Sequence, residues 1–336
     1  MKRLLRHGAA LAIACAVLAA RAAGPEACTR SPTARWDIAL EGNLPVTQGT
    51  VNGKPAGILI DTGSAASLLT EGAARRLGLV ARSSPERMRG IGGDSSLRVT
   101  RIDELRIGAW SAHAMMLHVG GDLAIPGVDL VLGEDVLHTL DVEFDYAALA
   151  VRVFEPASCG GAWLADWDRS AQVLDLERDD RAVRTTIEVN AVPALALLDS
   201  GAVRTLLSLE FAYRAGLAPD APGVRPAGCA AGLGGELVRA WAARFDSVRL
   251  GNETLRDAEL AFADFTVSPD APLLRAPALS YSRHGPDVLL GNDFLRTHRV
   301  LVARAQARVY FSYTGGTVFP RLPAAGCDER ARTPVD

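Results

Sequence analysis

The sequence is poor in the features that indicate a nucleic-acid-binding protein. Of its 336 residues, 36 are Lys or Arg and 39 are Asp or Glu, which gives a formal net charge of −3. Lysine occurs only at Lys2 and Lys54, and the arginines are scattered along the chain. Non-specific binding of nucleic acid requires clustered positive charge, so the composition argues against such a partner. Aromatic residues make up only 6%, so aliphatic side chains must fill most of the core.

Cysteine is scarce as well, and its spacing argues against a zinc site. None of the five cysteines forms a Cys-x-x-Cys pair and the six histidines are dispersed, so we predict no metal and no cofactor. Without Cys15, which lies in a segment expected to be removed, four remain, and an even number in an exported protein favours disulfides. Three pairings of Cys28, Cys159, Cys229 and Cys327 are possible, and the sequence does not choose among them; we favour Cys28–Cys159 with Cys229–Cys327, which ties one extension to each half.

Long apolar runs are lacking, apart from one near the start of the chain. Residues 1–22 combine three basic residues (Lys2, Arg3 and Arg6), an apolar run over 9–20 and a small-x-small cleavage signal. The run is too short to span a bilayer, so the pattern predicts an export peptide, with an uncleaved anchor as the alternative. We therefore expect a protein that is exported to the periplasm or secreted, with no membrane span after cleavage.

The remaining chain contains an internal duplication. ILIDTGSAASLLTEGAARRLGL, beginning at Ile58, aligns without a gap with ALLDSGAVRTLLSLEFAYRAGL, beginning at Ala196. Three further pairs of segments follow in the same order: GIGGD with GLGGE, RIDELRIG with RFDSVRLG, and DLVLGEDVL with DVLLGNDFL. The offset grows slowly from 138 to 158 residues, and chance does not produce four such matches in order. The extra residues of the second copy are assigned to a Pro- and Ser-rich loop, Thr266–His284.

Each copy has the local pattern of a β-rich lobe. Short apolar or alternating runs, separated by Gly and Asn, predict strands with tight turns. Thr70 and Ser208 are predicted to cap one short helix per copy, ending at Gly78 and Gly216, and a second helical turn is expected after each LGED or LGND motif. We therefore predict an all-β fold with short helices, built as two lobes. The predicted parts are a signal peptide at 1–22, an N-terminal extension at 23–43, a first lobe at 44–154, a connector at 155–179, a second lobe at 180–313 and a C-terminal tail at 314–336.

The most informative motif is Asp-Thr/Ser-Gly, which occurs once per copy at Asp61 and Asp199. Each follows three apolar residues, and a strand that ends on a buried carboxylate is costly unless the charge is paired or shares a proton. Equivalent positions of a duplicated fold meet near its pseudo-twofold axis, so the two carboxyl groups are expected to share one proton. The ionised partner can then activate a water while the protonated partner hydrogen-bonds the carbonyl under attack. This chemistry hydrolyses amides without a metal or a covalent intermediate.

The residues beside the two aspartates fit this interpretation. Gly63 and Gly201 allow a sharp turn that leaves the carboxylate accessible. The hydroxyl groups of Thr62 and Ser200 are expected to bond backbone across the junction of the copies. Ser64 is able to hydrogen-bond Asp61, whereas Ala202 gives Asp199 no such help, so we predict that the two aspartates are not equivalent.

On these motifs the sequence resembles the aspartic peptidases, in particular bacterial retropepsin-like proteins in a single-chain, two-lobed form. In that family an apolar-apolar-Gly element packs beneath each catalytic loop, and residues 130–133 and 288–291 match it. The resemblance places two flaps over an extended polypeptide substrate, at Gly90, Ile91, Gly92 and Gly93 and at Gly232, Leu233, Gly234 and Gly235. Neither flap contains the aromatic residue of pepsin-like enzymes, so two similar flaps resemble the retroviral dimer instead.

Other interpretations fit the residues less well than an endopeptidase does. GIGGD lacks the Lys-Ser/Thr of a phosphate-binding P-loop, and no His is duplicated beside Ser64 or Ser67 to activate a serine nucleophile. One chain supplies both aspartates, so a monomer is expected to suffice. The predicted function is an exported aspartic endopeptidase. The alternative is a catalytically silent module that binds a peptide or envelope partner in the same cleft; since such a module is free to lose either aspartate, the presence of both favours the enzyme.

Overall fold

The computed structural model describes residues 28, 30–120, 125–177, 181–233, 236–265 and 285–327. The expected export peptide, the loop at 266–284 and the flap glycines Gly234 and Gly235 lie outside these residues. Within them, no helix has both the length and the apolar character needed to cross a membrane.

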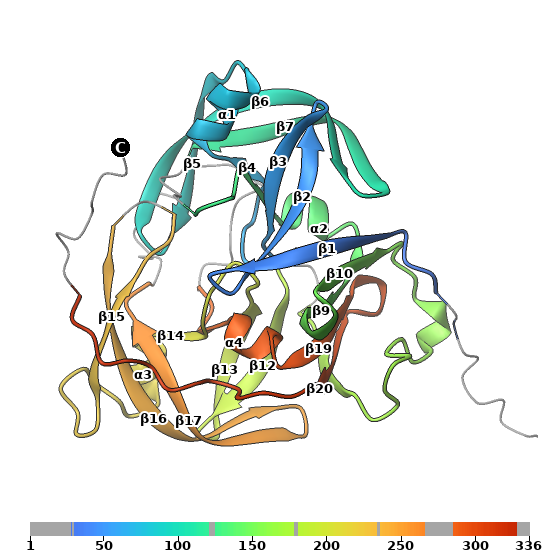
Figure 1. The fold of residues 1–336 in the computed structure, drawn as a ribbon. Coiled ribbons are helices and arrows are strands. Elements are labelled where there is room, and N and C mark those ends of the chain that lie inside the picture. Colours follow the sequence, from blue (N-terminus) through green and yellow to red (C-terminus); the bar gives the residue numbers. More distant parts are fainter. Residues whose placement is uncertain are drawn as a thin grey trace, which may run out of the picture.

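The first lobe and its flanking strands hold ten strands and three short helices (Figure 1). The strands are β1 (Ala34–Glu41), β2 (Leu44–Val51), β3 (Lys54–Ile60), β4 (Leu68–Leu69), β5 (Arg82–Gly90), β6 (Gly93–Ile107), β7 (Trp110–Gly120), β8 (Leu130–Leu132), β9 (Asp141–Asp145) and β10 (Ala150–Phe154). The helices are α1 (Glu71–Leu77), α2 (Glu134–Leu137) and the 3-10 turn η1 (Tyr146–Ala148).

The second copy repeats this order after a connector. The connector contains the 3-10 turn η2 (Cys159–Gly161) and the strand β11 (Gln172–Asp175). The second lobe then has β12 (Arg184–Val189), β13 (Val192–Leu198), β14 (Leu206–Ser208), α3 (Leu209–Arg214), β15 (Arg225–Ala230), β16 (Val238–Leu250), β17 (Glu253–Ala263), β18 (Val288–Leu290), α4 (Asn292–Leu295), β19 (His298–Ala303), η3 (Arg304–Gln306) and β20 (Arg308–Tyr313). The predicted β-rich, two-lobed duplication is confirmed.

Local chemistry explains where the helices begin and end. The side chains of Thr70 and Ser208 accept hydrogen bonds from backbone N–H groups in the first turn of α1 and α3, as predicted. Helix α1 runs to Leu77 and is closed by Gly78, and α3 runs to Arg214 and is closed two residues later by Gly216; both glycines have a positive φ, as expected of helix-ending glycines. Helices α2 and α4 supply the second helical turn expected of each copy.

Each lobe is a closed sheet. The first follows the strand order β2-β3-β8-β4-β7-β6 and closes where β2 pairs with β6; the second follows β12-β13-β18-β14-β17-β16 and closes where β12 pairs with β16. The strand that carries each aspartate runs parallel to the strand of its partner motif: β3 to β8, and β13 to β18. The two aspartates therefore leave their lobes at equivalent places.

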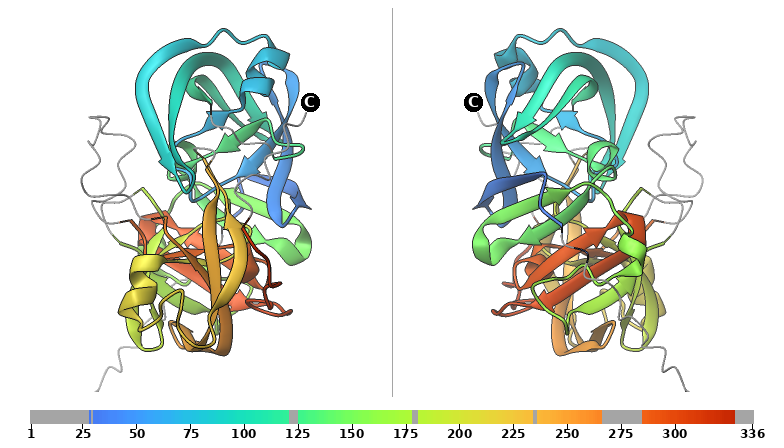
Figure 2. Two further views of the ribbon diagram at one scale, coloured as in Figure 1. Left: turned by 90° about the vertical axis from the view of Figure 1, so that its left-hand side faces the viewer. Right: turned by 90° about the vertical axis from the view of Figure 1, so that its right-hand side faces the viewer.

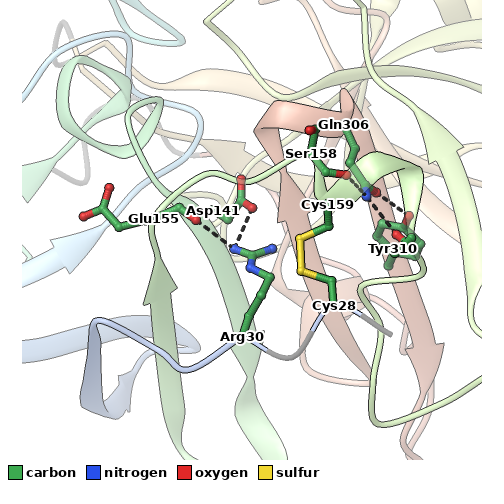
Figure 3. The surroundings of a disulfide bond; sticks show 9 residues. Cys28, Arg30, Asp141, Glu155, Ser158, Cys159, Gln306 and Tyr310 are labelled. Atoms are coloured by element: carbon green, nitrogen blue, oxygen red, sulfur yellow. Dashed lines mark hydrogen bonds and ion pairs between the residues drawn. A yellow bond between two sulfur atoms is a disulfide. The ribbon is translucent and has the colours of Figure 1, made fainter. Parts of the chain in front are cut away.

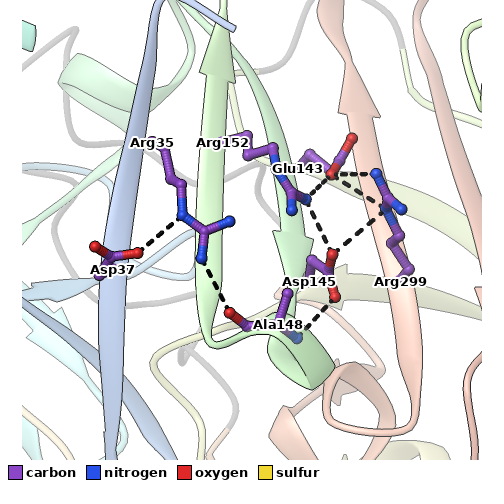
Figure 4. Close-up of polar contacts among 7 residues, drawn as sticks. All are labelled: Arg35, Asp37, Glu143, Asp145, Ala148, Arg152 and Arg299. Atoms are coloured by element: carbon purple, nitrogen blue, oxygen red, sulfur yellow. Dashed lines mark hydrogen bonds and ion pairs between the residues drawn. The ribbon is translucent and has the colours of Figure 1, made fainter. Parts of the chain in front are cut away.

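A shared sheet joins the two lobes, in the order β1-β10-β9-β19-β20-β11. In Figure 2 the green strands of the first lobe lie beside the red strands of the second. The shared sheet uses β1 from the predicted N-terminal extension and β11 from the predicted connector, and β9 of the first lobe pairs directly with β19 of the second. One face is apolar and belongs to the main core through residues such as Phe144 and Val300. On the other face, Glu143 and Asp145 lie between Arg152 and Arg299, with Arg299 Nη2 2.9 Å from Glu143 Oε1 (Figure 4).

Two disulfides fasten the ends of the chain to this framework. Cys28 bonds to Cys159 and Cys229 to Cys327, which is the pairing that we favoured. Beside the first disulfide, Arg30 lies 2.7 Å from the buried carboxylate of Asp141 at the start of β9 (Figure 3). The N-terminal segment is thus held against the shared sheet by a covalent bond and a partly buried ion pair.

Candidate active site

The catalytic candidates lie where the two lobes meet. The backbone N–H of Asp61 donates to the Leu132 carbonyl at 3.0 Å, and that of Asp199 donates to the Leu290 carbonyl at 2.9 Å. Each aspartate is therefore fixed by the apolar-apolar-Gly motif of its own lobe. The two carboxyl groups are hydrogen-bonded to each other. The structure thus brings together two residues that lie 138 positions apart in the sequence.

Two glycines make this close approach possible. A Cβ on Gly63 would lie closer than 3.0 Å to Cγ and both carboxyl oxygens of Asp199. A Cβ on Gly201 would overlap with Asp61 in the same way. Each carboxyl group therefore lies directly on the glycine of the opposite lobe, and the glycine of the motif is required by the partner aspartate as well as by its own turn.

The environment raises the pKa of both carboxyl groups, but not equally. Burial raises the pKa of Asp61 to about 6, against the effect of the Gly63 and Ser64 N–H groups that donate to its Oδ1 at 2.8 and 3.0 Å. Burial and the neighbouring Asp61 carboxylate raise the pKa of Asp199 to about 8. Asp199 therefore has the more strongly raised pKa of the two, because the Asp61 carboxylate adds to the effect of burial. Among the described residues, no cluster of three or more His, Cys, Asp or Glu is arranged to hold a metal ion.

Reciprocal hydrogen bonds lock the two loops together. Thr62 Oγ1 donates to the Leu198 carbonyl at 2.7 Å, and Ser200 Oγ donates to the Ile60 carbonyl at 2.8 Å. Each hydroxyl oxygen also accepts the backbone N–H of the other residue at 3.0 Å. These are the expected cross-lobe bonds, and both side chains are essentially buried, so every polar atom in this lock requires its partner.

Replacing Ser200 by Ala is expected to destabilise the protein. The Ile60 carbonyl and the Thr62 N–H lose their side-chain partner inside the junction, which costs about 1–3 kcal/mol for an unsatisfied buried group. Urea unfolding of the purified protein measures the difference. Ser200→Thr keeps the hydroxyl and copies the first lobe, so it should remain close to wild type; equal losses in both variants would contradict the role given to the hydroxyl.

The expected role of the Ser64 hydroxyl is wrong. Ser64 Oγ donates to the Ala66 carbonyl at 2.9 Å, and the contact with Asp61 is made by the Ser64 backbone N–H. An N–H group is present at every non-proline residue, so this contact does not depend on serine at position 64. The difference between the two aspartates therefore has another origin than the Ser64 side chain.

Sequence reasoning missed a second pair of supports beneath the loops. Asp135 Oδ1 accepts from both the backbone N–H and the hydroxyl of Ser67, at 2.9 and 2.7 Å. Asp293 Oδ1 does the same for Thr205, at 2.8 and 2.6 Å. The signal was present in the duplication, because both copies carry a hydroxyl residue six positions after the catalytic aspartate and an aspartate two positions after the glycine of the partner motif.

The two glycine-rich segments meet over the junction. The first is the turn between β5 and β6, and the second connects β15 to β16. The Gly92 N–H donates to the Leu233 carbonyl at 2.9 Å, and the Gly92 carbonyl accepts the Glu236 N–H at 3.0 Å. Ile91 packs against an apolar cluster of the second lobe, and Leu233 against one of the first. The apolar residue at the end of each glycine-rich segment therefore packs against the opposite lobe.

The two segments differ in how they are anchored. Cys229, near the end of β15, is bonded to Cys327, and the Gly228 N–H donates to the Ala325 carbonyl at 2.8 Å. The C-terminal tail is thereby tied to the second glycine-rich hairpin. Within the described part of the chain, β5 of the first hairpin contains no cysteine, so it has no such covalent link.

Comparison with known proteins agrees with this geometry. The aspartyl protease family matches the chain twice, over residues 47–136 and 185–294, which are the cores of the two lobes. Since the matched residues make up more than half of the chain, the protein belongs to the aspartyl protease family. No curated protein matches the sequence significantly.

Proposed function

We propose that the protein is an active aspartic endopeptidase that hydrolyses peptide bonds of extended polypeptides. One observation carries the proposal: two carboxyl groups on equivalent loops are hydrogen-bonded to each other, and burial raises the pKa of both. Such a pair holds one proton over a range of pH, which is the state that acid–base hydrolysis requires. The two glycine-rich tips support an extended substrate, since main-chain groups of these segments that are not already bonded between the tips could bond its backbone.

The proposed reaction follows from the unequal pKa values. Ionised Asp61 takes a proton from a water molecule as the water oxygen attacks the peptide carbonyl carbon, and Asp199 gives its proton to the carbonyl oxygen. The resulting tetrahedral gem-diol collapses when Asp61 passes its proton to the leaving nitrogen and Asp199 recovers one from a hydroxyl group. The C–N bond breaks, and the dyad returns to its singly protonated state.

The pH dependence of cleavage tests this assignment. A dyad with pKa values of about 6 and about 8 holds one proton between these limits, so kcat/KM should be bell-shaped with a maximum near neutral pH. Activity falls below pH 6, where the dyad binds a second proton, and above pH 8, where it loses the last one. Cleavage of an unfolded protein, followed by mass spectrometry from pH 3 to 10 with and without a statine-type inhibitor, measures the profile.

Two outcomes of this experiment are informative. A maximum near pH 3 would contradict the raised pKa values. No cleavage at any pH by the folded, oxidised protein would favour the silent binding module instead.

We also propose that the protein is exported and acts as a monomer. Two disulfides support export, because such bonds persist in oxidising compartments, and the basic and apolar pattern of residues 1–22 supports an export peptide. One chain supplies both halves of the dyad, which supports a monomeric enzyme.

A further inference from the structure

Each catalytic loop is braced by the residue that follows the glycine of its partner motif, and the two braces differ chemically. In the second lobe this residue is Asn292, which is fully buried. Its Nδ2 donates to the carbonyls of Ser200 and Ala202, both at 2.8 Å, and its Oδ1 accepts the hydroxyl of Tyr146 of the first lobe at 2.6 Å. The neutral amide therefore fixes the Asp199 loop and connects it to the opposite lobe.

In the first lobe the equivalent residue is Glu134, and its cross-lobe partner is Arg304. Arg304 occupies the position in the second copy that Tyr146 has in the first. The Glu134 side chain is 2% exposed, and its Oε2 accepts from Arg304 Nη2. Its other oxygen, Oε1, is buried and has no hydrogen-bond partner among the described residues. The Glu134 N–H donates to the Ser64 carbonyl at 2.8 Å, as that of Asn292 donates to Ala202 at 2.9 Å.

Glu134 Oε1, when ionised, lacks the hydrogen that Asn292 Nδ2 donates at the equivalent place in the second lobe. A buried carboxylate oxygen without a donor is costly, and an ionised carboxylate has no hydrogen to donate to a carbonyl. By the pseudo-symmetry, the acceptors that correspond to the Ser200 and Ala202 carbonyls are those of Thr62 and Ser64. The Ser64 carbonyl already accepts the backbone N–H of Glu134, as the Ala202 carbonyl accepts that of Asn292. The Glu134 side chain has a donor for either carbonyl only when it is protonated, as the amide of Asn292 has in the second lobe.

We propose that Glu134 is a positioning residue that holds the Asp61 loop in its protonated form, as Asn292 holds the Asp199 loop. This inference rests on the proposed peptidase function for its kinetic consequence only. Arg304, from the opposite lobe, orients the carboxyl group through Oε2 and leaves Oε1 to carry the proton. Glu134 touches no reacting atom in this role and acts through the loop.

The charges around Glu134 agree with the protonated form. Burial raises the pKa of Glu134 to about 8, and this outweighs the opposing effect of Arg304. The carboxylates of Asp61 and Asp135 contribute to this rise in the pKa of Glu134. Tyr146, on η1, is also buried near Asp61, and burial raises its pKa well above the usual range, so it contributes no charge. Loss of the Glu134 proton would therefore remove a donor and add a negative charge beside Asp61.

The kinetic test is Glu134→Gln, which imitates the protonated carboxyl group permanently. At pH 6 the variant should keep kcat/KM within about threefold of wild type. Above pH 8 the wild type should lose two protons, one from Glu134 and one from the dyad, so its kcat/KM should fall by about 100-fold per pH unit. The kcat/KM of E134Q, which loses only the proton of the dyad, should fall by about tenfold per pH unit. A loss of tenfold or more in E134Q at pH 6, or equally steep alkaline limbs, would overturn the proposal.

A stability measurement tests the same proton without requiring proteolysis. A carboxyl group whose pKa is higher in the folded state stabilises it at low pH, and that contribution is lost as the pH rises from the unfolded value towards the folded one. The folding equilibrium constant of wild type relative to E134Q should therefore fall by up to about tenfold per pH unit between about pH 5 and 8. A ratio that is constant with pH would contradict the protonated Glu134, whether or not the protein cleaves peptides.

Glu143→Gln is the matched control. Glu143 is also buried and paired with arginines, but it lies on the shared sheet, and its ion pairs are to Arg152 of β10 and Arg299 of β19. E143Q should leave the steepness of the alkaline limb unchanged. If it reduced the steepness as E134Q does, the effect would belong to buried carboxyl groups in general, and the assignment to Glu134 would fail.

Discussion

Replacing either Asp61 or Asp199, the proposed catalytic pair, by asparagine is expected to reduce peptide hydrolysis by about 10³-fold or more. In Asp199→Asn the side chain has no acidic proton to give to the substrate carbonyl, and in Asp61→Asn it is unable to accept one from water. Asparagine has nearly the same size, and the Gly63 and Gly201 N–H groups that donate to Asp61 Oδ1 and Asp199 Oδ1, at 2.8 and 2.9 Å, keep an oxygen acceptor. Both variants should therefore fold, and kcat/KM at pH 7 measures the loss.

The stability of Asp199→Asn should change in the opposite direction from its activity. Burial raises the pKa of Asp199 to about 8, so the native protein loses stability as the pH rises from about 4 towards 8. Asparagine does not titrate, and the variant should become progressively more stable than wild type over this window, by on the order of a few kcal/mol at pH 8. Urea unfolding at pH 4, 6 and 8 measures the trend.

Two further measurements complete this experiment. Asp37→Asn, at a highly exposed carboxylate, serves as the control and should change neither activity nor the pH trend. Binding of a statine-type inhibitor should weaken in D61N and D199N. Full cleavage by D199N would exclude the shared dyad, and equal peptide binding by wild type and D199N without cleavage by either would indicate a binding module.

The parts of the site that could be predicted from sequence are those that both copies repeat. Asp61 and Asp199 occur in the same gapless block, so their meeting at a pseudo-twofold axis followed from the duplication alone. The cross-lobe bonds of Thr62 and Ser200 could be predicted for the same reason, since each copy has a hydroxyl at that position. A duplicated sequence acts as its own alignment, and a residue type kept in both copies marks a shared structural need.

The parts that could not be predicted are contacts between unlike residues or between segments outside the repeat. Strand β11 has only four residues, none of them buried. Its sequence therefore has no alternation of apolar and polar residues that would predict its pairing with β20. Glu134 and Asn292 are different residue types, as are Tyr146 and Arg304, so the two braces were not recognisable as equivalent before the lobes were placed. Strand pairing and side-chain contacts between the lobes depend on which surfaces of the lobes meet. The hydrophobic periodicity of a short segment carries no information about those surfaces.

Gly63→Ala is expected to abolish the proposed peptidase activity through its effect on the opposite lobe. The added methyl group would lie closer than 3.0 Å to the whole carboxyl group of Asp199, so this group must move away from Asp61. Since Gly63 does not have a positive φ, alanine meets no backbone penalty there, and the effect isolates the contact between the lobes. Separating the two carboxyl groups removes the shared proton, and we expect kcat to fall by about 100-fold or more.

The stability of Gly63→Ala and a control variant distinguish the clash with Asp199 from a general effect of introducing alanine. Overpacking at a closed junction costs about 1–3 kcal/mol, which urea unfolding of Gly63→Ala should detect. Gly72→Ala is the matched variant, because Gly72 lies in α1 and a Cβ there meets nothing within 4 Å. It should keep full activity and gain up to about 1 kcal/mol from the better helix propensity of alanine. Wild-type kcat in Gly63→Ala would mean that the two carboxyl groups need not touch during catalysis, and the glycine of each motif would then serve only its own turn.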